Sequence, residues 1–368
     1  MIGWYVLVET DSALAVAIVS ALRFAGTLIG PFAGVVADRV ARRNLLLAMR
    51  AVFVVLGGAM ALVGLQGVVP IWFIFIVATV AGLLRPSEMM VRQSLVADTV
   101  PRNLLANAMG FTRTTMDSAR IAGAIAGAGL LSQVGLGPAY VVVTLMYVCS
   151  AVLTLRIPVL LTQVSAAAPL KEFKEGLAYI RDSRLIIAIM GLAFLVNLTS
   201  FPATGGLMPV IARDVFGFDA NGLAKLITAF ASGALIGSLG MAVLAKSSRP
   251  IGLMFGGLLT WHVCILIFAQ ITSPVLAYVA LFAIGASTSV GMIAMSVVLM
   301  MHTDIVVRGR VMGVRMLAVY GLPVGLVIAG VLIEATDVNT TISIHASIGL
   351  AVIAFAAIRW RHWMAKQT

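Results

Sequence analysis

Three ionisable residues, Arg113, Asp117 and Arg120, recur at intervals of four and three inside one apolar stretch. This spacing places the three side chains on one side of a helix. Counted from residue 104, Asp117 would lie about 20 Å along that helix at 1.5 Å per residue. Charges at such a depth in a membrane are costly and mark either a pathway or a partner. Asp117 is therefore the candidate proton carrier, and the alternative is a structural cluster that neutralises itself.

A second set of charges, Arg85, Glu88 and Arg92, also has helical spacing, and Pro86 would kink the helix beside it. This set lies near the end of its apolar stretch. The position favours a gate at the membrane surface over a central binding role.

Two further polar features fall inside predicted membrane-spanning stretches. Arg23 has no acid near it in sequence, so it needs a partner from another helix or an anionic substrate. Asn197 begins a polar stretch, broken by Pro and Gly, where amide and backbone groups can meet a ligand; a simple kink is the alternative. Trp261 and His262 are interpreted as packing residues. The predicted proton and substrate path consists of Arg23, Arg113, Asp117, Arg120 and Asn197.

A short turn at residues 34–43 holds one acid, Asp38, among three arginines. An Asp in a turn between helices can pair with an Arg of a neighbouring helix or sit at a helix N-terminus. Such a contact would hold the cytoplasmic ends of the helices closed; the alternative is a basic loop that only sets orientation. The predicted cytoplasmic gate consists of Gly34, Asp38, Arg39, Arg42, Arg43, Arg85, Glu88 and Arg92.

The elements that must position these residues follow from composition. Of the 368 residues, 61% are hydrophobic and 11% charged, whereas a soluble domain carries about 25% charged residues. A water-soluble fold is excluded, and an all-α membrane protein is predicted. Apolar stretches long enough to cross a bilayer predict eleven helices. They span residues 13–37, 44–64, 70–91, 104–131, 138–156, 185–211, 220–245, 251–271, 275–300, 310–334 and 341–359.

The net charge of +11 follows from the placement of Lys and Arg. Of the 25 basic residues, all lie on one side of the predicted helices except Arg23, Arg113, Arg120, Arg213 and Lys225. An excess of Lys and Arg marks the cytoplasmic side, so membrane orientation explains the charge better than nucleic-acid binding does. The C-terminus is then cytoplasmic and Met1 external. We interpret residues 1–8, with the interfacial aromatics Trp4 and Tyr5, as the outer end of a missing first helix.

One long cytoplasmic segment, residues 157–184, divides the chain into a first half (1–156) and a second half (185–368). Apolar residues at helical spacing predict an amphipathic helix inside it, lying on the membrane surface or against the bundle; a partner-binding helix is the alternative. The halves resemble each other, because Leu28 and Gly30 match Leu235 and Gly237 at an offset of 207. Internal repeats are typical of secondary transporters.

Pairs of glycines four residues apart occur in every third predicted helix and let another backbone approach closely; Gly252 and Gly256, in the span 251–271, are an additional pair outside this pattern. We predict that these four helices meet across the two halves and slide during transport; ordinary helix packing is the alternative. The pairs are Gly26 and Gly30, Gly123 and Gly127, Gly233 and Gly237, and Gly321 and Gly325.

The turn at residues 34–43 resembles the signature loop between helices 2 and 3 of the major facilitator superfamily, with Ala41 in place of the usual glycine. Other stretches are similar to one branch, the drug and siderophore exporters that include the enterobactin and macrolide exporters. They are residues 94–98, 100–102, 105–108, 175–180, 207–214 and 229–237. The resemblance covers nearly the whole chain.

This resemblance implies the major facilitator fold, with two pseudo-symmetric halves of six helices. On that count the chain holds eleven of twelve transmembrane helices, and the glycine-faced helices are numbers 2, 5, 8 and 11, which in the family line the contact between the halves. The branch usually has Gly-Pro after an Arg in helix 5. Here Gly123-Ala124 follow Arg120, which weakens the inferred direction of transport more than the fold.

No phosphate-binding glycine loop, nucleophile motif or metal-ligand spacing occurs in the sequence, so neither an enzyme nor a cofactor or metal site is expected. We expect a monomeric, proton-coupled exporter of a small amphipathic compound in the inner membrane. The partners implied are the substrate, protons and the lipid bilayer. Two alternatives remain: an importer or metabolite permease of the same fold, and a truncated remnant that does not transport.

Overall fold

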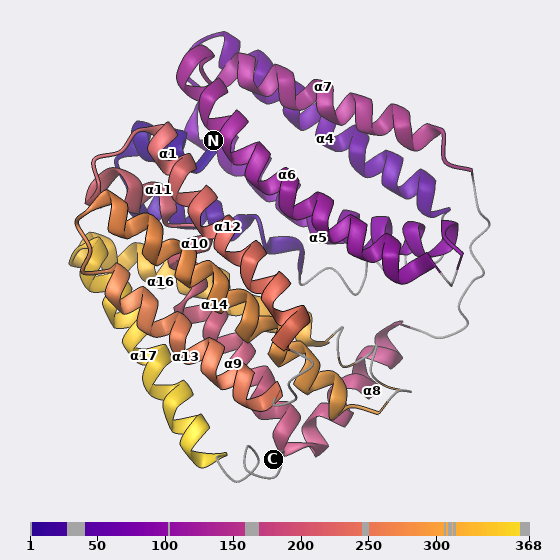
Figure 1. The fold of residues 1–368 in the computed structure, drawn as a ribbon. Helices are drawn as coiled ribbons and strands as arrows, with labels where there is room; N and C mark the ends of the chain where they lie inside the picture. Colours follow the sequence, from indigo (N-terminus) through magenta and orange to yellow (C-terminus); the bar gives the residue numbers. More distant parts are fainter. Residues whose placement is uncertain are drawn as a thin grey trace. The chain divides into compact units, whose positions relative to one another are not determined.

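The computed structural model describes residues 2–27, 41–101, 104–158, 169–244, 250–304, 307, 311 and 314–360. Every regular element in this part of the chain is helical (Figure 1). The chain divides into two compact units. The first comprises Met1–Tyr5 and Leu22–Lys174, and the second comprises Val6–Ala21 and Glu175–Thr368. Residues 6–21, from the start of the chain, thus pack with the helices of its second half.

The first unit is built on α4 (Arg42–Leu65), α5 (Ile71–Thr99), α6 (Leu105–Val134) and α7 (Leu136–Leu155), with the 3₁₀ turn η1 (Ala25–Thr27). Helices α4 and α7 approach closely because small residues face each other. A Cβ on Gly64 would lie 2.8 Å from Cα of Gly137. The Phe53 and Tyr147 rings stack across the same contact with centroids 5.1 Å apart.

The second unit holds α2 (Ala13–Leu22) up to Ala21, and the helices of the C-terminal half. These are α9 (Arg184–Thr199), α10 (Phe201–Gly205), α11 (Met208–Val210), the π-helical turn η3 (Ile211–Val215), α12 (Ala220–Leu244), α13 (Pro250–Phe268), α14 (Pro274–Met301), η5 (Met316–Tyr320), α16 (Gly321–Ala335) and α17 (Val338–Arg359). Helix α1 (Ile2–Thr10) begins in the first unit and continues in the second.

All eleven predicted spans contain a helix. Eight helices of the described chain are long and apolar enough to cross a membrane, and the bent pair α8–α9 makes a ninth. The predicted spans 13–37 and 104–131 hold the shorter apolar helices Ala13–Thr27 and Ile121–Val134. The predicted amphipathic helix is α8 (Pro169–Asp182), which meets α9 at a bend of 107° after Ser183.

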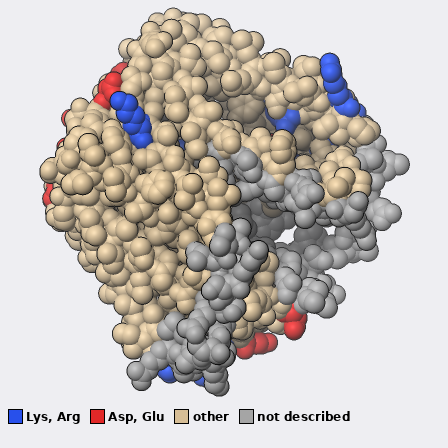
Figure 2. All heavy atoms as spheres, viewed as in Figure 1, with Lys and Arg blue, Asp and Glu red and all other residues tan. Residues whose placement is uncertain are grey.

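The outer faces of these helices are apolar. Large side chains such as Leu62, Trp72, Ile267 and Phe355 are more than half exposed, and Figure 2 shows few charged atoms on the visible surface. A soluble protein rarely exposes so much continuous apolar surface. In a bilayer these side chains face lipid, so the fold is that of an integral membrane protein.

Candidate functional site

The predicted cytoplasmic gate is described only in part. Gly34, Asp38 and Arg39 lie outside the described residues. Arg42 and Arg43 occupy the first turn of α4. Arg85, Glu88 and Arg92 lie on α5, which contains Pro86.

The structure brings Arg50 of α4 into the same cluster. Its guanidinium Nη1 donates to the Ser150 carbonyl at 2.6 Å and to the Thr154 hydroxyl, both on α7. Arg50 also interacts electrostatically with Glu88 and Arg92. Glu88 therefore lies among several guanidinium groups, and the cluster carries excess positive charge.

Tyr147 of α7 also reaches this cluster, through electrostatic interactions with Arg85, Glu88 and Arg50. The sequence interpretation missed both Arg50 and Tyr147. A usable signal was the spacing of Tyr147, Ser150 and Thr154, at intervals of three and four on one face of their helix. The cluster ties α4, α5 and α7 together with charge-assisted contacts.

The predicted proton and substrate path is only partly assembled. Arg23 follows α2 and packs its backbone on α5, because a Cβ on Gly82 would lie 2.9 Å from Cα of Arg23. Its charge interacts with the buried Tyr140. Arg113, Asp117 and Arg120 lie on α6, and their side chains are outside the described part of the structure. Asp117 precedes the apolar segment Ile121–Val134 of that helix.

Asn197 lies in α9, where its side chain is buried and donates to the Ala193 carbonyl at 2.8 Å. The predicted break follows it directly: α9 ends at Thr199, and α10, α11 and η3 continue the chain in short pieces. Pro202 explains the break, since it cannot donate the backbone hydrogen bond of a continuing helix.

His262 of α13 forms hydrogen bonds with the residues at this break. Its ring is fully buried, with Nε2 at 2.7 Å from the Ser200 hydroxyl and 3.1 Å from that of Thr199. Nδ1 lies 2.8 Å from the Leu258 carbonyl. A carbonyl only accepts, so Nδ1 carries the proton, and the neutral ring accepts the Ser200 hydroxyl at Nε2. The sequence treated His262 as a packing residue; the structure adds that it joins two helices.

Gly349 of α17 makes room for this ring, because a Cβ at that position would collide with Nε2 of His262. Trp261 packs edge-on against Phe201 of α10, with ring centroids 4.9 Å apart. Helices α13 and α17 thus pack together beside the break.

We expect His262→Leu to lower the free energy of unfolding by about 2 kcal/mol, because it leaves the completely buried Ser200 hydroxyl without its acceptor. The double variant with Ser200→Ala removes that stranded hydroxyl and should recover about 1 kcal/mol of the loss. Detergent-denaturation curves of the two single variants and the double variant measure this coupling. If the losses of unfolding free energy in the two single variants simply add up in the double variant, the hydrogen bond contributes nothing.

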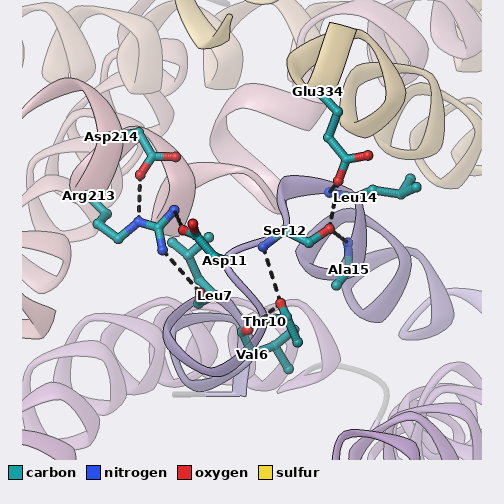
Figure 3. Close-up of polar contacts among 10 residues, drawn as sticks. All are labelled: Val6, Leu7, Thr10, Asp11, Ser12, Leu14, Ala15, Arg213, Asp214 and Glu334. Atoms are coloured by element: carbon teal, nitrogen blue, oxygen red, sulfur yellow. Dashed lines mark hydrogen bonds and ion pairs between the residues drawn. The ribbon is translucent and has the colours of Figure 1, made fainter.

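A second polar network of the second unit gathers around the turn between α1 and α2 (Figure 3). Arg213 of η3 pairs with Asp11 at 2.7 Å and with Asp214 at 2.5 Å, and it donates to the Leu7 carbonyl at 3.1 Å. A cation at the carbonyl end of α1 also complements the helix dipole. The hydrogen bond to Asp214 raises the pKa of Arg213, so this group stays charged.

Glu334, near the C-terminal end of α16, contacts the other side of the α1–α2 turn. Its carboxylate accepts the Ser12 hydroxyl at 2.7 Å and the Leu14 amide at 3.4 Å. Ser12 in turn accepts the Ala15 amide at 3.1 Å, as a helix cap does. Asp11 between these contacts has φ 52°, a left-handed conformation that Asp tolerates better than most residues.

The structure shows close packing at several of the predicted glycines. A Cβ on Gly233 or Gly237 of α12 would collide with the backbone of Phe282 or Ala286 in α14. Gly321 and Gly325 meet the backbone of α9 in the same way, and Gly26 meets Leu83 of α5. Each of these contacts lies within one compact unit, and the predicted meeting of the four glycine-faced helices across the halves stays a prediction. A Cβ on Gly123 would meet no atom within 4 Å.

The predicted repeat is visible in these contacts. Gly26 and Gly233 are separated by the same 207 residues as Leu28 and Leu235. Gly26 packs on α5 beside Gly82, and Gly233 packs on α14 near Gly285, so corresponding glycines make corresponding helix crossings in the two units.

Apolar spanning helices and a repeated helix crossing define a polytopic helical membrane protein of the kind that forms transporters. The profile of the Major Facilitator Superfamily matches residues 1–326. The chain therefore belongs to this superfamily of secondary transporters.

Two relatives are efflux or resistance proteins by name. Macrolide efflux protein A of Streptococcus pyogenes is 23% identical over 253 residues, which cover 67% of this chain and 62% of that protein. Multidrug resistance protein MdtG of Escherichia coli (strain SMS-3-5 / SECEC) is 25% identical over 300 residues, covering 77% and 69%. The match thus spans less than two thirds of the macrolide protein's length.

Solved structures support the fold. The nucleoside transporter NupG superposes with a TM-score of 0.79 over 100% of this chain and 94% of that one, at 15% identity. The D-xylose-proton symporter superposes with a TM-score of 0.72 over 93% and 86%, at 14% identity. At these identities the likeness concerns the fold alone.

Proposed function

We propose that the protein is a proton-coupled exporter of a small amphipathic compound. The observation that carries this proposal is the match to efflux proteins over about two thirds of the chain, within a superfamily of secondary transporters. Proton gradients drive such export when a carboxyl group in the pathway takes up and releases a proton in different conformations.

Each predicted residue has a role in this mechanism. Asp38, Arg39, Arg42 and Arg43 would join the cluster of Arg85, Glu88 and Arg92 as a cytoplasmic gate. The position of Glu88 among Arg50 and Arg92 supports that role, since a fixed carboxylate in a positive cluster is a ready partner for a moving Arg. Asp117 would carry the proton, and Arg23, Arg113, Arg120 and Asn197 would line the path.

We also propose the orientation. In this orientation α8 and the C-terminus lie on the cytoplasmic side of the inner membrane, and the turns holding Asp11, Arg213 and Asp337 lie on the outer side. The distribution of Lys and Arg supports it. The pKa of Asp337 is lowered by the hydrogen bonds it accepts from Thr340, so this outer carboxylate caps α17 as a charged group.

Proteoliposomes test the function. Purified protein is reconstituted with a radiolabelled macrolide as the probe, and a proton gradient is imposed in either direction. We expect the macrolide to move against the proton flow and to reverse direction when the gradient is reversed. Empty liposomes and a protonophore are the controls. Macrolide movement with the proton flow would indicate an importer, and gradient-independent leakage equal to that of empty liposomes would contradict transport of this compound class.

A further inference from the structure

We infer that Arg213 and Glu334 form a two-point latch that holds the outer ends of α1 and α2 against the helices of the second half. This inference rests on the proposed transport by alternating access. Opening toward the outside requires helices of the first sequence half to leave those of the second. Residues 6–21 belong to the first half by sequence, yet they pack within the second unit.

The first point of the latch is Arg213. Its three donor contacts go to Asp11, to Asp214 beside it, and to the Leu7 carbonyl at the end of α1. Figure 3 shows the guanidinium reaching from η3 toward the α1–α2 turn. The Asp11 side chain is 85% exposed and that of Arg213 is 28% exposed. Such a pair is weak because solvent screens it, so thermal motion can release it.

The second point is Glu334, on a different helix. Its carboxylate lies at the N-terminus of α2, where a negative charge is favourable, and binds the Ser12 hydroxyl and the Leu14 amide. The two points hold adjacent residues, Asp11 and Ser12, from opposite sides (Figure 3). Both must release before the turn can move away.

Below the latch, α2 packs directly on α16 and on the segment after α10. A Cβ on Gly330 would lie 2.8 Å from that of Ala17, and a Cβ on Gly206 would lie 2.9 Å from that of Ser20. Ser20 also donates to the Gly206 carbonyl at 3.4 Å. This contact is tight and contains no ion pair among the atoms described, whereas both points of the latch contain a charged group.

A cysteine introduced at the buried α2 contact becomes accessible to a thiol reagent only when the latch opens. Ser20 is buried at 5% exposure, and Ser20→Cys is nearly isosteric. In a background with Cys149→Ala and Cys264→Ala, the rate of labelling by a membrane-impermeant maleimide added outside cells measures the open population. We expect Arg213→Gln or Glu334→Ala to raise that rate about two- to fivefold, and the two together to multiply these increases.

Matched variants separate the latch from other effects. Asp11→Asn should raise the rate less than Arg213→Gln does, because Arg213→Gln also removes the hydrogen bond to the Leu7 carbonyl. Adding Asp11→Asn to Arg213→Gln should give no further increase, because the Asp11 contact is already lost. Arg213→Lys, which keeps the charge, should remain near the wild-type rate. Asp337→Asn removes an outer carboxylate that touches none of residues 6–21 among its described contacts, and should change nothing. Unchanged labelling in the Arg213→Gln and Glu334→Ala double variant, or an equal increase with Asp337→Asn, would overturn the latch.

The labelling needs neither substrate nor proton gradient. If the variants label as expected and no compound is exported, the proposed function fails and the latch stands. If export is found and labelling is insensitive to both residues, the latch alone fails.

Discussion

Asp117→Asn is expected to abolish gradient-driven transport while leaving the protein folded. Asn keeps the size and hydrogen-bonding capacity of Asp but cannot bind and release a proton. Asp117 lies twelve residues into α6, or about 18 Å along the helix axis, where an acid needs a function or a partner. Transport should therefore fall to the level of empty liposomes, measured as radiolabelled macrolide moved by an imposed proton gradient.

Two controls separate proton binding from structure. Asp117→Glu retains a titratable carboxyl group and should retain part of the gradient-driven transport. Asp337→Asn removes a carboxylate from an exposed turn and should transport normally. Monodisperse elution of Asp117→Asn in size-exclusion chromatography shows that it folds. Wild-type transport by Asp117→Asn would eliminate the proton role and leave Asp117 as part of a self-neutralised cluster with Arg113 and Arg120.

Gly233→Val is expected to destabilise the second unit by about 3 kcal/mol or more. A Cβ on Gly233 would collide with the carbonyl oxygen of Phe282 and lie 2.8 Å from its Cα. These are backbone atoms of α14, which cannot rotate away as a side chain can, so α12 and α14 would have to separate. The loss should appear as a lower midpoint in a detergent denaturation curve and a lower yield of monodisperse protein.

The same helix provides the control. A Cβ on Gly240 of α12 would meet no atom within 4 Å. Gly240→Ala should therefore be neutral, or stabilising by up to about 1 kcal/mol, since Ala favours a helix over Gly. If Gly233→Val and Gly240→Ala unfold at the same detergent concentration, the close approach of α12 and α14 is not required. Because the repeat aligns Gly26 with Gly233, Gly26→Val should show the same defect through α5 of the first unit.

The spans and the family could be predicted from the sequence because both depend on local patterns. A run of apolar residues long enough to cross a bilayer forms a helix wherever it occurs, since no other local structure satisfies its backbone in lipid. The eleven predicted spans therefore each contain a helix, and the offset of 207 places Gly26 and Gly233 at equivalent crossings. The break after Asn197 was also predictable, because Pro202 acts on its own helix.

The partners of the polar residues could not be predicted, because they depend on how each helix is rotated about its axis and which helix lies beside it. Arg213 binds the Leu7 carbonyl 206 residues away, and Ser12 binds Glu334 322 residues away. In the sequence His262 is a histidine with no polar partner nearby, whereas in the folded protein it lies beside Ser200. The glycine pairs predict that a backbone comes close, whereas only packing decides that Gly233 meets α14 of its own unit. In this protein the sequence by itself determined which segments cross the membrane and which faces admit a close neighbour. The tertiary structure decided which residues meet, because such contacts form only when distant helices have docked.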